Sequence, residues 1–308
     1  MRARRLFQQN FPPHRIPKHD SRTSGTLPAW PERGSAMITC DLHSHTCHSH
    51  ARDTAVQMYE AALAKGLAVF GFSEHSPRPE RFTYTREYRD RLNAGLPDYV
   101  REVKALQADG RCRVLFGMEI DWFESDQDFV RRAATQFDFD YLIGSVHFLG
   151  EWGFDDRQED WDRLSAARKD ECYQAYFTTW RKMIETGWFN IAAHPDLIKI
   201  FSVDDFHRWL AREASLRLVK EGLLALKAKG MAMEISSAGI RKPCREIYPC
   251  AAIMRMAADL GLDITFASDA HATEDVAHAF PRLATYARAF GFADSVVFAH
   301  GATSRMAF

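Results

Sequence analysis

Short apolar segments alternate with longer amphipathic segments along most of this chain. This alternation is typical of βα units that assemble into a parallel sheet. Seven or eight such units favour a closed barrel over an open sheet, so we expect an α/β fold of the TIM-like barrel type. The expected strands are Ile38–Leu42, Ala68–Phe72, Arg113–Ile120, Tyr141–Val146, Phe189–Ala193, Met231–Ser236, Asp263–Ala267 and, as an eighth candidate, Ser295–Phe298.

The amphipathic segments predict the helices that connect these strands. Glycines follow several of these segments, as expected where a helix ends in the left-handed conformation; they are Gly66, Gly187, Gly230, Gly261 and Gly291. The expected helices are Ala55–Lys65, Asp98–Ala108, Asp126–Gln136, Arg168–Thr186, Trp209–Lys229, Ala251–Leu260 and Val276–Phe290.

Histidines and carboxylates stand at the C-terminal ends of nearly all the expected strands. In a parallel barrel these ends converge on one face, where active sites lie. His43 and His45 are two residues apart and point to the same side, so both can bind one ion. A single histidine at a strand end is more often structural, but the repetition favours a common site. The motifs are Asp41-x-His43-x-His45, Glu74-His75, Glu119, His147, His194-Pro-Asp196 and Asp269-x-His271.

The residue types in these motifs indicate a metal centre. Imidazole and carboxylate ligands without cysteine suit Zn, Fe or Mn. Seven histidines and two carboxylates are too many for one ion, and they fit a cluster in which a carboxylate such as Glu119 bridges two ions. We therefore expect a metal-dependent hydrolase. Five of the 13 histidines in the chain have no such spacing and are expected to be structural or exposed: His14, His19, His207, His278 and His300.

This set of motifs resembles the PHP (polymerase and histidinol phosphatase) superfamily, and within it the histidinol-phosphatases of the HisJ type. The resemblance covers about residues 37–300 and implies a distorted (β/α)7 barrel with a trinuclear metal site. Supporting stretches are Gly117–Asp121, Gly144–Phe148, His194–Leu197 and Ser236–Pro243 with Glu246–Pro249. The stretch that begins at Ser236 is the one that narrows the resemblance to the phosphatases.

The resemblance also implies roles for individual residues. Glu119, Asp269 and His271 are the expected catalytic residues, Arg241 and Lys242 are expected to bind the substrate phosphate, and Asp41, Glu74 and Asp196 to orient imidazoles. His48 competes with His50 as the loop ligand, and the spacing after His45 favours His50. The three implied metal sites comprise His43, His45, Glu119 and Asp269; Glu119, His147 and His194; and His50, His75 and His271.

The activity that this resemblance implies is hydrolysis of L-histidinol phosphate to L-histidinol and phosphate, a step of histidine biosynthesis. An alternative is a phosphoesterase of the same superfamily acting on a nucleotide or nucleoside bisphosphate, and a third is a metal-binding domain without catalysis. The segments Ser76–Pro97 and Leu149–Ala167 are rich in aromatic and acidic residues. They are expected either to contact the imidazole and ammonium groups of the substrate or to pack the barrel mouth.

Charge divides the chain into two parts. Residues 1–36 carry a net charge of +5 and five prolines, and residues 37–308 a net charge of −6. We expect the first part to be a disordered extension, or a consequence of a start codon placed upstream of Met37, and the second to be the metallophosphatase barrel. A net negative barrel does not favour nucleic acid as a partner, so a small phosphate monoester is the expected ligand.

Cysteines and hydropathy bear on the compartment. Six cysteines without a C-x-x-C pair are expected to be thiols in a reducing compartment, which indicates the cytoplasm. No apolar run approaches the roughly 18 residues of a membrane helix, and residues 1–36 have no apolar core of a secretory signal. The sequence leaves open whether the protein is a monomer or a homo-oligomer.

Overall fold

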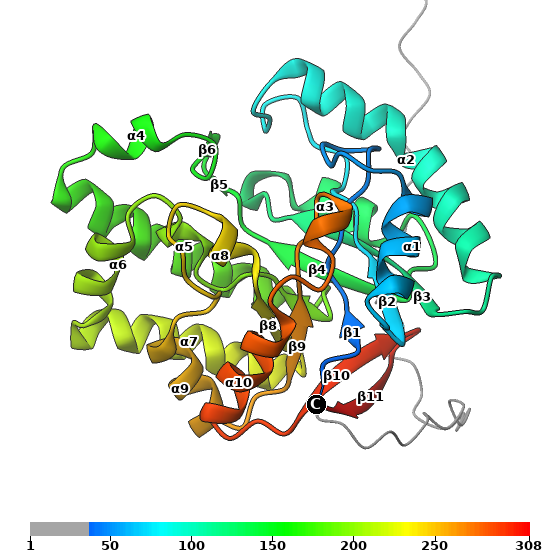
Figure 1. Cartoon of the computed structure of the whole chain (residues 1–308). Helices are drawn as coiled ribbons and strands as arrows, with labels where there is room; N and C mark the ends of the chain where they lie inside the picture. Colours follow the sequence, from blue (N-terminus) through cyan, green and yellow to red (C-terminus); the bar gives the residue numbers. More distant parts are fainter. Residues whose placement is uncertain (1–36) are drawn as a thin grey trace, which may run out of the picture. The chain divides into compact units, whose positions relative to one another are not determined.

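A computed structural model describes residues 37–308, and the predictions for residues 1–36 lie outside this range. Seven strands form one parallel sheet in the order β1-β2-β3-β4-β7-β8-β9, with helices around it (Figure 1). Each of the first seven expected strands is present in this sheet. Their bounds are β1 Cys40–Asp41, β2 Val69–Phe72, β3 Arg113–Asp121, β4 Tyr141–Ser145, β7 Ile191–Ala192, β8 Ala232–Ser236 and β9 Ile264–Ala267.

The sheet curves until its two edge strands approach each other. Between β1 and β9, the Leu42 amide donates to the Phe266 carbonyl over 3.2 Å. Just beyond the strand ends, the His45 amide donates to the Ala270 carbonyl over 2.9 Å. These bonds nearly close the barrel, which confirms the distorted (β/α)7 fold of the PHP type.

The eighth candidate strand is real but lies outside the barrel sheet. Strand β10 (Asp294–Ala299) pairs antiparallel with β11 (Ala302–Ala307) in a separate hairpin. The remaining short strands, β5 (Phe148–Leu149) and β6 (Trp152–Gly153), form a second hairpin after β4.

The seven predicted helices are present in the predicted order, and the bounds of two of them differ most from the prediction. The helix expected from Asp98 begins twelve residues earlier, because the Thr85 side chain accepts from the Tyr88 amide and caps its start; Pro97 lies inside it. The helix expected from Trp209 is interrupted at Arg212, whose backbone is extended. The helices are α1 Ala55–Ala64, α2 Arg86–Gln107, α3 Gln127–Thr135, α4 Gln158–Asp162, α5 Ala166–Thr186, α6 Val203–Leu210, α7 Glu213–Lys229, α8 Ala238–Arg241, α9 Ala251–Asp259 and α10 Phe280–Ala289, with short 3₁₀ turns η1 Glu124–Asp126, η2 Leu197–Lys199 and η3 Thr273–Asp275.

A single tyrosine fills much of the space between the first four strands. The Tyr141 hydroxyl donates to the Leu42 carbonyl over 2.6 Å, so this side chain of β4 reaches the end of β1. Gly71 and Gly117 leave room for it, since a Cβ at Gly117 would lie 2.5 Å from Tyr141 Cζ. The glycines in β2 and β3 are therefore required by packing.

Two further expectations can be compared with the structure. All six cysteines are free thiols, five of them buried. Among residues 37–308, no helix combines the length and the apolar character needed to cross a bilayer.

Candidate metal centre

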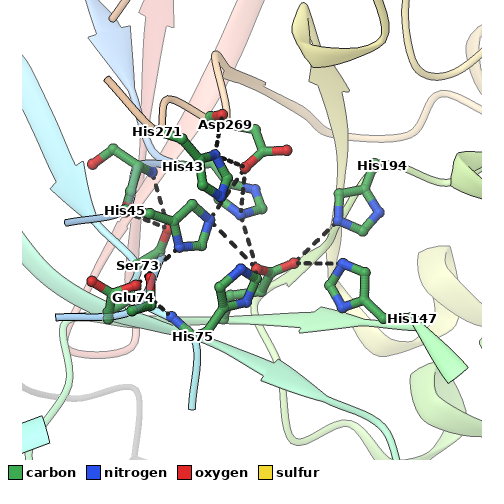
Figure 2. A network of polar contacts seen from close by, with 12 residues as sticks. His43, His45, Ser73, Glu74, His75, His147, His194, Asp269 and His271 are labelled. Carbon is green, nitrogen blue, oxygen red and sulfur yellow. Dashed lines mark hydrogen bonds and ion pairs between the residues drawn. The ribbon is translucent and has the colours of Figure 1, made fainter. Parts of the chain in front are cut away.

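The C-terminal ends of the barrel strands bring the predicted ligands to one place, where six of the nine are buried, Asp269 and His271 are half-buried and His50 is exposed. His43 and His45 follow β1, His75 follows β2, and Glu119 lies near the end of β3. His147 follows β4, His194 follows β7, and Asp269 and His271 follow β9. Figure 2 shows His147 and His194 on one side of the cluster, and His43, His45 and Asp269 on the other.

Glu119 stands between these two sides. Its Oε1 lies 3.1 Å from His194 Nε2 and 3.6 Å from His147 Nε2. Its Oε2 lies 2.9 Å from His75 Nδ1, 3.3 Å from His43 Nε2 and 3.6 Å from His45 Nε2. The carboxylate is 1% exposed, so its two oxygens face two separate sets of imidazoles in a dry environment.

The donor atoms fit divalent ions. Three groups of side chains each place their ligand atoms within 4.8 Å of one another: His43, His45 and Asp269; Glu119, His147 and His194; and His45, His75 and His271. Several of these atoms are buried and have no hydrogen-bond partner among the described residues, namely His43 Nε2, His45 Nε2, His75 Nδ1, Glu119 Oε2, His194 Nδ1 and His271 Nε2. Buried polar atoms are normally paired, so these atoms are suited to ligate a metal.

The two histidines that compete as the loop ligand, His48 and His50, lie in different surroundings in the loop after β1. The His50 ring lies 4.3 Å from that of His271 and 5.1 Å from that of His75, measured between centroids. His48 Nε2 instead lies 3.0 Å from Glu102 Oε2 on α2, away from the cluster. The structure thus brings His50 beside the third implied site, and its role as a ligand stays a prediction.

Three carboxylates orient the imidazoles from behind. His43 donates from Nδ1 to Glu234 Oε2 over 2.7 Å, and His45 from Nδ1 to Glu74 Oε1 over 3.2 Å. His147 Nδ1 donates to Asp121 Oδ1. Each bond leaves Nε2 free to face the cluster, as metal-binding histidines require.

Of these three, only Glu74 was among the predicted orienting residues. Glu234 and Asp121 were missed. Asp121 had a signal, since it stands two residues after Glu119 and so faces the same side of β3. Glu234 is a single acidic residue in an apolar strand, Ala232–Ser236, and it too could have been noticed as a buried charge.

The other two predicted orienting carboxylates act on the backbone, and for them the prediction was wrong. Asp41 accepts from the Ser268 amide over 2.9 Å and from the Ala277 amide over 3.1 Å, which fixes the loop after β9. Asp196 accepts from Lys199 Nζ and from the Cys250 amide, each over 2.8 Å. These donors are backbone amides and a lysine, and neither carboxylate accepts from an imidazole among the described residues.

The two residues expected to bind phosphate differ in their placement. Lys242 lines the cavity above the cluster. Arg241 donates from Nη2 to the carbonyls of Ser268 and Asp269, each over 3.0 Å, and pairs with Asp275. Asp269 has a φ of 50°, a conformation unusual for a residue other than glycine, and these bonds hold it. A direct contact of Arg241 with substrate stays a prediction.

Charge in the cluster shifts the proton affinities of its members. Burial alone would raise the pKa of Glu119, but the imidazoles of His43, His75 and His147 hold it well below its usual range. Burial opposes a proton on His45 and on His147, yet the adjacent carboxylates raise each pKa to about 9. Burial and neighbouring imidazoles lower the pKa of His271 to about 3. Without a metal, protons thus remain on some imidazoles at neutral pH.

A cavity of about 340 Å³ opens above the cluster. Its floor is formed by the predicted ligands. Its walls come from the segments after β2 and β4 and from the far side of the barrel; they comprise Arg78, Tyr84, Thr85, Tyr88, Asp155, Asp156, Leu197, Ile200, Lys242 and Tyr248. Other aromatic residues of the same segments, Phe82, Phe154 and Trp161, are buried in the core. Packing therefore accounts for these three residues, and contact of the cavity-lining residues with a substrate stays a prediction.

Comparisons with known proteins agree with this geometry. A "probable histidinol-phosphatase" of Deinococcus radiodurans is 34% identical over 78% of this chain and 89% of its own length. The histidinol-phosphatase of Bacillus subtilis is 27% identical over 78% of this chain and 96% of its own. The histidinol phosphate phosphatase of Lactococcus lactis, solved with zinc, L-histidinol and phosphate, has the same fold: the TM-score is 0.70 at 22% identity, over 86% of this chain and 98% of that one. The model of the PHP domain matches residues 41–238, and the chain belongs to the PHP domain family.

Proposed function

We propose that this protein is a metal-dependent histidinol-phosphatase, which hydrolyses L-histidinol phosphate to L-histidinol and phosphate. The observation that carries the proposal is Glu119, whose two oxygens face separate sets of imidazoles at the floor of a cavity. Two of the relatives described above bear the name histidinol-phosphatase, and the chain spans nearly their whole length. A phosphatase is therefore supported by both the site and the family.

The metal content is part of the proposal. Nine ligands would hold three divalent ions, Zn, Fe or Mn, in the sets His43, His45, Glu119 and Asp269; Glu119, His147 and His194; and His50, His75 and His271. Such ions, when bound, supply Lewis acidity that activates water and neutralises charge on a phosphoryl group. Glu119 is shared between two sets, so it fixes the spacing between them.

The catalytic assignment rests on three of these ligands. Glu119 is buried and Asp269 is half-buried, and the adjacent imidazoles keep the pKa of each carboxyl well below its usual range, so both stay ionised. His271 donates from Nδ1 to the Asp269 carbonyl over 3.0 Å, which directs its Nε2 lone pair away from that loop. We assign to them the positioning of the reacting centre.

The cavity walls offer partners for both ends of the substrate. Lys242 supplies a cation for the phosphate from one wall. Asp155 and Asp156 stand on the wall formed after β4, where their carboxylates suit the ammonium group of histidinol phosphate. Asp155 is held by the Tyr84 hydroxyl, which donates to it over 2.7 Å. A substrate that carries both a phosphate and an ammonium group therefore matches a cavity with a lysine on one wall and two aspartates on another.

The decisive experiment measures phosphate release from histidinol phosphate against a panel of monoesters that includes nucleotides and a nucleoside bisphosphate. We expect histidinol phosphate to have the highest kcat/KM, activity to fall on chelation, and activity to return when a divalent metal is added. Equal rates across the panel would reject histidinol phosphate as the substrate. Undiminished activity in the chelated, metal-free protein would reject the metal centre.

A further inference from the structure

The three carboxylates behind the imidazoles differ in what holds them. Glu234 accepts from the His194 amide over 3.1 Å. Glu74 accepts from the amides of Thr46 and His75, over 2.9 and 3.0 Å. Both are thus fixed by the backbone of the site itself.

Asp121 is held in another way. Arg78 donates from Nε to Asp121 Oδ2 over 2.6 Å, while Asp121 Oδ1 accepts from His147. Of the three orienting carboxylates, Asp121 is the one that forms an ion pair with an arginine or lysine among residues 37–308. The imidazole of His147 therefore depends on a side chain that lies on the segment after β2.

Arg78 has an unusual setting for a structural residue. Its side chain is 0% exposed, and neither Nη1 nor Nη2 has a hydrogen-bond partner among the described residues. Its Cζ lies 5.0 Å from the ring centroids of Tyr84 and Tyr88 and 5.2 Å from that of Phe148. These three rings offset part of the cost of burying the charge and fix the plane of the guanidinium.

This setting calls for a role beyond packing. A buried ion pair is often no more stabilising than apolar side chains of the same volume, and unpaired N–H groups add to the cost. The Arg78–Asp121 ion pair contacts His147, which belongs to the candidate metal-binding group Glu119, His147 and His194. In this group His147 Nε2 lies 3.6 Å from Glu119 Oε1. The ion pair therefore fixes the direction in which His147 Nε2 points.

We propose that Arg78 is a positioning residue of the metal centre: it fixes Asp121, and through Asp121 it holds His147 as a ligand of the ion shared with Glu119 and His194. The proposal rests on the metal centre of the proposed function and is independent of the substrate. Loss of an orienting partner weakens metal binding by roughly 10- to 100-fold. We expect that loss at one ion and no change at the others.

The test measures zinc retained per chain when the zinc-loaded, full-length protein is titrated with a competing chelator. We expect Arg78→Gln to bind one zinc equivalent with about 10- to 100-fold weaker affinity than the wild type, so that the chelator removes it at a correspondingly lower concentration. The zinc affinity of Arg78→Lys should lie between those of the wild type and Arg78→Gln. Asp121→Asn is expected to release the same equivalent. Adding Arg78→Gln to Asp121→Asn should weaken binding little further, because both act along one path.

Arg81→Gln is the matched control. Arg81 lies over the Phe82 ring and pairs with Asp126, but it is 47% exposed and does not line the cavity. It should retain zinc as the wild type does. Circular dichroism of each variant reports its folding, and if Arg78→Gln does not fold, Arg78→Lys and Asp121→Asn carry the comparison.

Wild-type zinc retention in a folded Arg78→Gln or Arg78→Lys protein would overturn the proposal. So would an equal weakening of every zinc equivalent, or additive effects of Arg78→Gln and Asp121→Asn. Failure of the protein to hydrolyse histidinol phosphate would leave these zinc measurements unchanged, so the two proposals fail independently.

Discussion

His43 Nδ1 lies 2.7 Å from Glu234 Oε2, although 191 residues separate the two along the chain. Glu234 projects from β8, and its other oxygen accepts from the backbone amide of His194. One buried carboxylate therefore joins His43, which follows β1, to the backbone of His194, which follows β7. It also directs His43 Nε2 toward Glu119.

Replacing this carboxylate by an amide should loosen the centre. The side chain of Glu234→Gln has one acceptor oxygen, so it can serve His43 or the His194 amide but not both. We expect zinc affinity to fall roughly 10- to 100-fold at the affected site, with activity falling in parallel, as measured by metal analysis after dialysis against chelator. Glu102→Gln, which alters the partner of His48 outside the cluster, should leave zinc unchanged; an equal loss in both variants would contradict the assignment.

Glu119→Ala should abolish both metal binding at two sites and phosphatase activity. Its oxygens face His147 and His194 on one side and His43, His45 and His75 on the other. Zinc content and phosphate release are measured on the same preparation. Glu124→Ala, at an exposed carboxylate that pairs with Lys182, serves as the control. Full activity in Glu119→Ala would show that the carboxylate is not shared by metals.

The sequence was sufficient to predict the barrel and the convergence of the predicted ligands at one end of it. Parallel strands converge at their C-terminal ends, so histidines placed there along the chain must meet in space. His43, Glu119, His147 and His194 lie together for that reason.

The orienting partners could not be predicted in the same way. Whether Glu234 faces His43 depends on how β8 sits relative to β1, two strands that are not neighbours in the sheet. Arg78 lies in a loop whose path is set by packing against Tyr84 and Phe148. Such contacts arise from tertiary structure and leave no periodic pattern in the sequence.

The competition between His48 and His50 can be decided by substitution. His50→Ala should lose metal from the site that includes His75 and His271, because the three rings lie together. His48→Ala should retain it, since His48 pairs with Glu102. Metal analysis of the two variants, prepared identically, makes the comparison. Metal loss confined to His48→Ala would reverse the assignment.

Gly117→Ala should destabilise the barrel without touching a ligand. The added methyl would lie 2.5 Å from Tyr141 Cζ, so the ring or the strand must shift. We expect a loss of about 1–3 kcal/mol in the free energy of unfolding, measured with urea. Combining it with Tyr141→Leu, which removes the clashing atoms, should cost less than the sum of the two single changes. Strict additivity would argue against this contact.

The free energy of unfolding of the metal-free protein should fall between about pH 6.5 and pH 9. Carboxylates that outweigh burial raise the pKa values of His45 and His147 from 6.5 to about 9. In this range the folded state keeps protons that the unfolded state has released, so the stabilisation is complete below pH 6.5 and is lost as the pH rises through 9. His50 and His271 have pKa values of about 2 and 3 and are neutral in the folded state, and the unfolded state has released most of their protons by about pH 7.5, so they oppose this trend only near pH 6.5.

Bound zinc should offset this decline in stability with pH. Metal and protons compete for the same imidazoles, so the stabilisation that zinc provides should grow from pH 6.5 to pH 9 as fewer protons have to be displaced. Urea unfolding of chelated and zinc-loaded protein at both pH values measures it. Each proton that the folded state holds and the unfolded state does not corresponds to about 1.4 kcal/mol per pH unit. His147→Gln should reduce the decline of the metal-free protein, whereas His300→Gln, at an exposed residue, should not. A metal-free protein that is as stable at pH 9 as at pH 6.5 would show that these imidazoles hold no protons in the folded state.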